Sequence, residues 1–300
     1  MTGSREFLKN VRRLHLALFL AGSLLLSLAS AHSLFAQGGQ PVLVIDVEDA
    51  ISPGSTSYVS HALEQARLQG AQLLVIRLDT PGGLVSSTRA IVKLIFASST
   101  PVAVFVAPGG ARAASAGTFI TMSAHIAAMA PGTNIGAASP VAGGGKQIEG
   151  DMRNKAMNDV AAFARSIATR MGRNAEWAES AVREAVSVDE AEALKLKVID
   201  LVAVDVKSLL LALNGRKIKL ASGQEVVLAT RDAQVVSLDR TWRDQVLSLL
   251  SDPNIAYILM LLGMYGLFFE LSNPGNILPG VVGAISILLA LYAMKVLPIN

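Results

Sequence analysis

Two stretches, Leu78-Asp79-Thr80-Pro81-Gly82-Gly83 and Ala113-Ala114-Ser115-Ala116-Gly117, decide how this sequence is interpreted. Each follows a short apolar run that is typical of a buried strand: Leu73–Leu78 precedes the first and Val102–Ala107 the second. The first stretch ends in a glycine turn, where backbone amides can approach a ligand without a Cβ clash. The second presents a serine hydroxyl among small residues. An amide-bearing turn beside an exposed hydroxyl supplies two parts of an acyl-transfer site.

Residues 41–210 alternate short apolar runs with amphipathic stretches. The runs predict strands over 41–47, 73–78, 102–107, 126–130 and 198–204. The amphipathic stretches predict helices from Ser55 or Thr56 to near Gly70, over Val85–Ser98, over Ala113–Ser123, over 152–171, and after a capping box at Ser187 and Glu190. Because the strands are apolar on both faces, helices should cover both sides of a parallel sheet. The expected fold class is therefore α/β.

The composition separates the ends of the chain from its middle. Of the 300 residues, 52% are hydrophobic and only 16% are charged, and the excess of apolar residues lies near the two termini. The net charge of +3 is small and owes much to basic residues at the extreme N-terminus, so we expect no nucleic-acid partner. Cysteine is absent, which excludes disulfides, cysteine nucleophiles and thiolate metal sites.

Residues 1–36 have the pattern of a signal peptide or an N-terminal anchor. Basic residues come first, the apolar run Leu14–Leu28 follows, and Ala29-Ser30-Ala31 fits a cleavage site, with Ala36 as a second candidate. The apolar core is short for an uncleaved anchor, which favours cleavage. In both cases the domain that follows should lie on the extracytoplasmic side of a membrane.

Residues 211–250 differ in character from the alternating part of the chain. The turn pairs Asn214-Gly215 and Ser222-Gly223 separate short alternating segments, Lys217–Leu220 and Glu225–Ala229. These segments predict a small β element. An amphipathic stretch then links it to the apolar C-terminal part.

Residues 255–297 hold two apolar segments, Ile255–Leu271 and Val281–Leu297. As a helix, each segment is about 26 Å long, close to the ~30 Å hydrocarbon core of a bilayer. They predict two membrane spans joined by a tight turn at Asn273–Asn276. The alternative is a buried helical hairpin in a soluble protein.

The glycine turn and the serine each have two interpretations. The amides of Gly82 and Gly83 stabilise the oxyanion of an acyl transfer, or the turn is simply a tight connection after a strand. Ser115 should lie where a strand gives way to a helix, whose N-terminus favours developing negative charge. Its hydroxyl is then a nucleophile, or the serine is a small residue that allows close helix packing.

A serine nucleophile requires a base. His61 lies on an early helix, and His125 lies at the entrance to a strand, where a structural role fits better. A lysine can serve if burial lowers its pKa from ~10.4 towards neutrality. Lys155 is expected in the first turn of the long helix, on the flank of its apolar stripe, whereas Lys146 lies in a glycine loop open to solvent. Spacing alone leaves Lys155 open as a base or as a surface charge.

Four motifs resemble those of the NfeD-type membrane serine proteases, the stomatin operon partner proteins. The motifs are Asp79-Thr80-Pro81-Gly82-Gly83, Ala113-Ala114-Ser115-Ala116-Gly117-Thr118, Met129-Ala130-Pro131-Gly132-Thr133-Asn134-Ile135-Gly136-Ala137 and Asp252-Pro253-Asn254. The resemblance extends over roughly residues 40–297 and implies a ClpP/crotonase-like catalytic domain followed by a transmembrane helical hairpin. It implies that Ser115 is the nucleophile and Lys155 the base. It also implies an oxyanion hole from the amides of Gly83 and Ala116, with Gly82 supporting the turn.

The same resemblance implies a membrane-anchored endopeptidase with a Ser–Lys dyad that needs no metal or cofactor. Its substrate would be an apolar segment of a stomatin-like membrane protein, bound against Leu84, Val85 and Phe119, and we expect a homo-oligomer. An inactive membrane scaffold of the same fold is the main alternative, and an acyl-thioester enzyme of the same superfamily fits an exported domain less well. Longer family members continue with more membrane helices and an OB-type domain. We therefore expect either a fragment or a chain that lacks that module.

Overall fold

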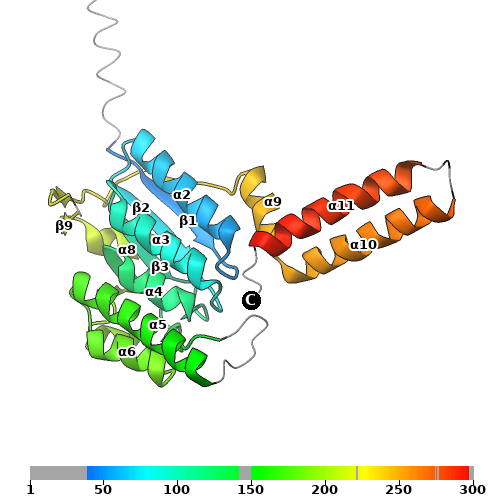
Figure 1. The fold of residues 1–300 in the computed structure, drawn as a ribbon. Helices are drawn as coiled ribbons and strands as arrows, with labels where there is room; N and C mark the ends of the chain where they lie inside the picture. The colour runs from blue at the N-terminus through cyan, green and yellow to red at the C-terminus, as the bar shows by residue number, and fades with distance from the viewer. Residues whose placement is uncertain (1–38, 142–149, 221, 274, 276, 297–300) are drawn as a thin grey trace, which may run out of the picture.

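The computed structural model of the protein describes residues 39–141, 150–220, 222–273, 275 and 277–296. The signal peptide expected over 1–36 and the glycine loop with Lys146 lie outside the described residues. The described chain forms a layered α/β domain from which two long helices project side by side (Figure 1).

A six-stranded parallel sheet is the centre of the domain. Its order is β11-β1-β2-β3-β5-β8, and every neighbouring pair is parallel. The strands are β1 (Val42–Val47), β2 (Leu73–Leu78), β3 (Val102–Val106), β5 (Ile126–Met129), β8 (Leu201–Val202) and β11 (Val235–Ser237). All strands therefore end at one edge of the sheet, and the two stretches that follow β2 and β3 meet at that edge.

The side chains of β1, β2, β3 and β5 alternate between two hydrophobic cores. In β2, for example, Leu74, Ile76 and Leu78 belong to one core, whereas Leu73 and Val75 belong to the other. Both faces of the sheet are therefore buried. This explains why the strands are continuous apolar runs with no polar alternation.

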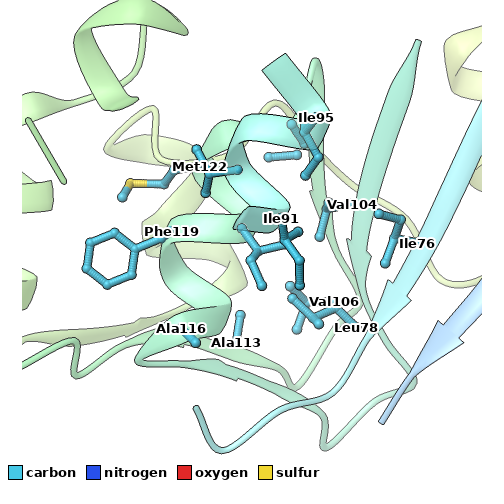
Figure 2. Close-up of a cluster of buried hydrophobic side chains, with 14 of the residues drawn as sticks. Ile76, Leu78, Ile91, Ile95, Val104, Val106, Ala113, Ala116, Phe119 and Met122 are labelled. Atoms are coloured by element: carbon cyan, nitrogen blue, oxygen red, sulfur yellow. The ribbon is translucent and has the colours of Figure 1, made fainter. Parts of the chain in front are cut away.

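Helices cover both faces of the sheet. On one face lie α2 (Pro53–Leu68), α3 (Val85–Ala97) and α4 (Ala116–Ser123), flanked by α5 (Gly150–Arg170) and α6 (Ala175–Arg183). On the other face lie α8 (Val206–Leu213) and the antiparallel hairpin of β9 (Lys217–Lys219) and β10 (Glu225–Val227). Figure 2 shows Ile91 and Ile95 of α3 among the side chains that fill the first core. The predicted α/β class is confirmed.

A small three-stranded sheet carries the second motif to the carboxyl edge of the main sheet. In it, β4 (Arg112–Ala114) pairs in parallel with β6 (Asn134–Gly136), which pairs antiparallel with β7 (Ser187–Asp189). An isolated bridge between Thr80 and Ala113 joins this sheet to the end of β2. The helix predicted from Ala113 is therefore wrong in its first residues. They form a strand because partners on both sides pair with them.

Two predicted boundaries also shift. α2 starts at Pro53 with Ser52 as its cap, and not at Ser55 or Thr56, because the fixed φ of proline suits the first turn of a helix. The strand predicted over 198–204 is reduced to the two residues of β8. The residues before it turn off the sheet and fill the first core instead.

The sequence pattern also missed the cap of α7 (Glu190–Lys195) and the strand β11. α7 is capped by Asp189, whose carboxylate accepts a hydrogen bond from the Glu192 amide at 2.8 Å. Ser187 lies in β7, so the capping box predicted there is wrong. Strand β11, within residues 211–250, adds to the main sheet beside β1. Two of its three side chains are exposed, so no apolar run marks it.

The chain ends in α9 (Trp242–Leu250), α10 (Pro253–Ser272) and α11 (Ile277–Val296). Residues 254–272 of α10 are long and apolar enough to cross a membrane, with a mean hydropathy of 1.8, and Ile277–Ala293 is a shorter apolar segment. Only 11% of the α10 segment is buried, so its apolar side chains do not fill a soluble core. Small residues let the two helices approach closely: a Cβ on Gly266 would lie 2.8 Å from the Gly283 Cα.

Arg173 joins three parts of the domain through one buried side chain. Its guanidinium donates to the carbonyls of Met122, Ala124 and Val198 and to the carboxylate of Asp200. Arg173→Ala should lower the free energy of unfolding by about 3 kcal/mol, because it leaves buried acceptors and a carboxylate unpaired. Urea denaturation of the full chain in detergent measures this loss. Arg67→Ala, which removes an exposed pair with Glu64, should leave the free energy of unfolding nearly unchanged, and equal losses for the two variants would contradict the assignment.

Candidate active site

One backbone pairing fixes the glycine turn after β2. Ile51 donates its amide to the Gly82 carbonyl at 2.8 Å and accepts a hydrogen bond from the Leu84 amide at 2.8 Å. In a parallel pairing, the residue between the two bonded ones directs its own amide away from the partner, so the Gly83 N–H faces the opposite side. A Cβ on Gly83 would lie 2.2 Å from the Ile51 carbonyl oxygen. Only glycine fits this position.

Ser115 lies between β4 and α4 in a backbone conformation that is rare for a residue with a side chain. Its φ is 49° and its ψ is −108°. The Ser115 amide donates to the Gly136 carbonyl at 3.0 Å, and the Thr118 hydroxyl lies within hydrogen-bond distance of the Gly136 and Ala113 carbonyls. Strain that surrounding bonds hold in place is concentrated at functional sites in proteins. The Ser115 side chain is half-buried, so its hydroxyl remains reachable.

The turn and the serine face each other. A Cβ on Gly82 would lie 2.9 Å from the Ser115 Cβ and 3.3 Å from its Oγ, so the bare glycine leaves room for the hydroxyl. Ala116 is the first residue of α4, and its amide therefore has no acceptor inside the helix. Neither the Gly83 amide nor the Ala116 amide donates to a group among the described residues. The site thus offers two unused donors beside a hydroxyl.

Thr80 connects the glycine turn to the strand that leads to Ser115. Its amide donates to the Arg112 carbonyl at 2.8 Å, and its carbonyl accepts from the Ala114 amide at 3.1 Å, which aligns β4 with the turn. The Thr80 hydroxyl lies 2.8 Å from the Asp49 carbonyl and accepts from the Gly82 amide at 3.2 Å. A single buried threonine therefore holds the serine strand and the glycine turn in one geometry.

An open, largely apolar pocket adjoins Ser115. It is lined by Gly83, Val85, Thr88, Ser115, Ala116, Phe119, Ala138, Pro140, Val160 and Phe163. None of these lining residues is ionisable. The rings of Phe119 and Phe163 stack at 5.6 Å, which closes the wall between α4 and α5. Of the three residues predicted to bind substrate, Val85 and Phe119 line the pocket and Leu84 does not.

Val160 and Phe163 are lining residues that sequence reasoning did not assign to the site. Both belong to the apolar stripe predicted for the long helix, so their burial was expected. The surface that the stripe would cover was not evident, because the packing of α5 on α4 brings together segments that are distant in sequence. Ala138 and Pro140 carry no signal that would mark them as pocket residues.

Lys155 does not lie in the pocket wall. α5 begins at Gly150, so Lys155 lies in its second turn and not in its first, and its side chain is exposed. The buried face of α5 is made largely of small residues: Val160, Ala161, Ala164, Ile167 and Ala168. The predicted stripe followed large residues such as Met152, which is 70% exposed. At 3.6 residues per turn, the true buried face points away from Lys155, so the predicted flank position is wrong.

Arg89, beside the pocket, and His125, at the opposite edge of the main sheet, both have partners. Arg89 donates to Asp159 at 2.6 Å, and its guanidinium lies 4.2 Å from the centre of the Phe163 ring. His125 accepts a hydrogen bond from the Val102 amide on Nδ1 at 3.2 Å. Burial, with help from a nearby arginine, lowers the pKa of the His125 imidazole below its usual value. The histidine thus has a structural partner, as expected.

Two known protein domains match this chain, and both agree with the geometry described above. The NfeD1b N-terminal domain matches residues 41–218, and the NfeD integral membrane domain matches residues 254–300. The chain therefore belongs to the NfeD family and carries a membrane domain. The resemblance stated from four motifs is confirmed, and the buried hairpin of a soluble protein is the poorer account of α10 and α11.

Two curated relatives are similar over most of the chain. The membrane-bound protease PH1510 of Pyrococcus horikoshii is 38% identical over 254 residues, which cover 83% of this chain and 57% of that protein. The membrane protein NfeD1b of Bacillus subtilis is 30% identical over 273 residues, which cover 91% of this chain and 60% of that protein. The chain thus spans less than two thirds of the length of either relative.

Solved structures of 1510-N, a membrane-bound stomatin-specific protease from Pyrococcus horikoshii, share the fold. A lysine-to-alanine mutant in complex with a substrate peptide matches with a TM-score of 0.65 and 36% identity, covering 70% of this chain and 96% of that chain. A serine-to-alanine mutant matches with a TM-score of 0.64 and 36% identity, covering 68% of this chain and 100% of that chain. The α/β domain described here therefore resembles a protease domain that has been seen with a peptide bound.

Gly83→Ala should lower the free energy of unfolding by about 3 kcal/mol, because the new Cβ would overlap the Ile51 backbone. Thermal or urea denaturation of the full chain in detergent measures the loss. Gly110→Ala is the matched control, since its φ is 91° but a Cβ there meets nothing within 4 Å. It should cost only the backbone term of about 1 kcal/mol. Equal losses at the two positions would show that Ile51 does not constrain the turn.

Proposed function

We propose that this chain is a membrane-anchored serine endopeptidase in which Ser115 is the nucleophile and Lys155 is the general base. One observation carries the proposal: the hydroxyl of a strained serine faces a turn of two glycines, and the amides of Gly83 and Ala116 beside it donate to no group among the described residues. That arrangement matches the needs of acyl transfer, in which a nucleophile attacks a carbonyl and fixed donors stabilise the resulting oxyanion.

The reaction follows from these positions. Ser115 Oγ attacks the peptide carbonyl carbon while the neutral Lys155 amine takes the hydroxyl proton. The amides of Gly83 and Ala116 stabilise the tetrahedral oxyanion. When the peptide C–N bond breaks, the Lys155 ammonium delivers its proton to the leaving nitrogen, and an acyl ester remains on Ser115. Water then attacks the ester, gives its proton to Lys155, and releases the acid as Oγ regains a proton.

Lys155 can act only after a change in its surroundings, because its side chain is exposed in the free chain. Val160 and Phe163 of the same helix line the pocket, and Lys155 precedes Val160 by about 7.5 Å along the helix axis. Residues 151–155 are all exposed, so a rotation of this end of α5 that turns Lys155 towards the pocket breaks few contacts. We infer that a bound apolar peptide covers Lys155 and removes water from its amine, which favours the neutral form.

The residue types agree with the archaeal relative. The solved variants of 1510-N replace a serine in one case and a lysine in another, the same two residue types as in the proposed dyad. That protease is described as stomatin-specific, and the pocket described here is largely apolar. We therefore propose that the substrate is an apolar segment of a stomatin-like membrane protein, bound in extended form against Val85 and Phe119.

The membrane arrangement is part of the proposal. With an export signal over 1–36, the α/β domain lies on the extracytoplasmic side and α10 runs inward. The turn between α10 and α11 then faces the cytoplasm, and both helices span the bilayer. We also propose that the chain forms a homo-oligomer.

An inactive scaffold of the same fold remains the second candidate, and one observation favours it. No ionisable side chain lines the pocket among the described residues, and Lys155 is exposed on the far face of α5. A protein that only binds apolar segments of membrane partners would need the pocket but not the base. The two candidates differ in whether peptide cleavage depends on Ser115.

Four variants of the full chain in detergent test the dyad with an apolar peptide substrate. Ser115→Ala and Lys155→Ala should each lower kcat at least about 100-fold, because the nucleophile or the base is lost. Lys155→Arg should be as inactive as the alanine variant, since a guanidinium does not give up its proton. Lys146→Ala is the matched control and should keep near-normal activity. Near-normal cleavage by Lys155→Arg would mean that Lys155 is not the base, and cleavage unaffected by Ser115→Ala would remove the serine mechanism.

A further inference from the structure

Helix α9, between the α/β domain and the hairpin, has an exposed apolar stripe. Trp242, Val246 and Leu249 are 69%, 44% and 56% exposed. Spacings of four and three residues place all three side chains on one face of the helix. This face is distinct from the one that packs on the domain, where Asp244 is buried.

The inward face of α9 is fixed on α2. The Ser57 hydroxyl donates to the Asp244 carboxylate at 2.7 Å. The backbones of the two helices nearly touch, since a Cβ on Gly54 would lie 2.6 Å from the Ser248 amide nitrogen. Such close contact prevents α9 from rolling about its axis. The direction in which the Trp242 stripe points is therefore set by the domain.

The stripe is continuous with the surface of the membrane hairpin. α9 ends just before α10 begins at Pro253, and it runs across the base of the hairpin (Figure 1). Leu250, at the end of α9, packs with Ala256 of α10 and Ala293 of α11. A surface that surrounds this base, such as the face of a bilayer, would therefore also meet α9.

Aromatic residues mark the level at which that bilayer face lies. Tyr257, near the start of α10, and Tyr292, near the end of α11, are 67% and 48% exposed. The close contact of Gly263 with Ile287 sets the antiparallel register of the two helices, and this register puts Tyr257 and Tyr292 at the same depth. Tryptophan and tyrosine are enriched where hydrocarbon meets headgroups. The two tyrosines therefore indicate a boundary within a few turns of α9.

We propose that α9 is an interfacial helix whose Trp242, Val246 and Leu249 side chains insert into the headgroup region of the bilayer that α10 and α11 enter. The neighbouring Arg243 is exposed, with its guanidinium 5.5 Å from the Trp242 ring, where it can reach lipid phosphates while the indole inserts. Lipid contact by α9 does not depend on the proposed peptidase activity.

This contact would also orient the site. α9 is fixed to the first turns of α2, and α2 follows directly after Ile51, which pairs with the turn that holds Gly83. The depth and tilt of α9 in the membrane surface therefore set the height of the Ser115 pocket above the bilayer. A substrate segment that leaves the membrane beside the hairpin would meet the pocket at a fixed height.

Tryptophan fluorescence tests the proposal, because the chain has only two tryptophans. Trp177 is buried in the domain, so Trp177→Phe leaves Trp242 as the single reporter. The full chain is placed in phosphatidylcholine vesicles with bromine atoms either near the headgroups or deep in the acyl chains. We expect the shallow bromine to lower Trp242 emission at least about twofold and the deep bromine to lower it less, as insertion in the interface requires.

Two further variants keep the test decisive. If Trp177→Phe does not fold, Trp242→Phe serves instead. In that variant the buried Trp177 is the only source of tryptophan emission, so subtracting its emission from that of the natural chain gives the quenching of Trp242. The double variant Val246→Asp with Leu249→Asp should abolish quenching of Trp242, since charges oppose insertion. Trp242 that is open to acrylamide in vesicles and unaffected by brominated lipid would overturn the proposal. So would protection that disappears when the protein is diluted with lipid, which would mean that a second copy of the chain covers the stripe.

Discussion

The pairing of Ile51 with the turn at Gly82–Leu84 is the constraint on which the rest of the site depends. It directs the Gly83 amide into the site, and it admits no side chain at Gly83. Thr80 then aligns the serine strand against the same turn, so the strained serine is held by bonds from both sides. The parallel sheet makes this geometry available because its strands end at one edge, where a turn and a helix N-terminus lie side by side. The geometry of the site thus follows from the sheet topology and from the hydrogen bonds made by Ile51 and Thr80.

In the free chain the proposed base lies outside the pocket. The pocket wall has no ionisable side chain among the described residues, and Lys155 lies exposed on α5. An exposed lysine is a poor base, whereas one that a substrate covers can lose its proton. If a substrate completes the proposed dyad in this way, Ser115 stays inactive until an apolar segment is bound. Under that proposal, other membrane proteins nearby would not be cut at random.

Much of the fold was predictable because its physical causes are local. Continuous apolar runs predicted the buried strands, and because these runs are apolar on both faces, they also predicted the parallel sheet and the α/β class. Two apolar segments near the C-terminus predicted the hairpin. The strand Arg112–Ala114 was missed because small residues carry no period, and only pairing with Thr80 and Gly136 makes it a strand. The face of α5 was misjudged because alanines form much of the surface that packs against the domain.

The site was predicted in a different way. The residues alone suggested the turn and the serine, but they left the role of each open. The resemblance to the NfeD family decided between those roles, and that membership is now shown by the match to residues 41–218. Pocket residues such as Val160 and Phe163 could not be assigned beforehand, since helix packing brings distant segments together. Sequence motifs therefore predicted candidate reacting groups, whereas they did not predict most of the pocket wall around them.

The central claim is that Ser115 is an activated nucleophile, and covalent labelling tests it most directly. The full chain in detergent is treated with a serine-directed acylating probe, and the modified residue is located by mass spectrometry. The account predicts one adduct, on Ser115, and slower labelling when Lys155 is replaced by alanine. No adduct on Ser115, in a chain whose folding is verified by circular dichroism, would contradict the account and favour an inactive scaffold.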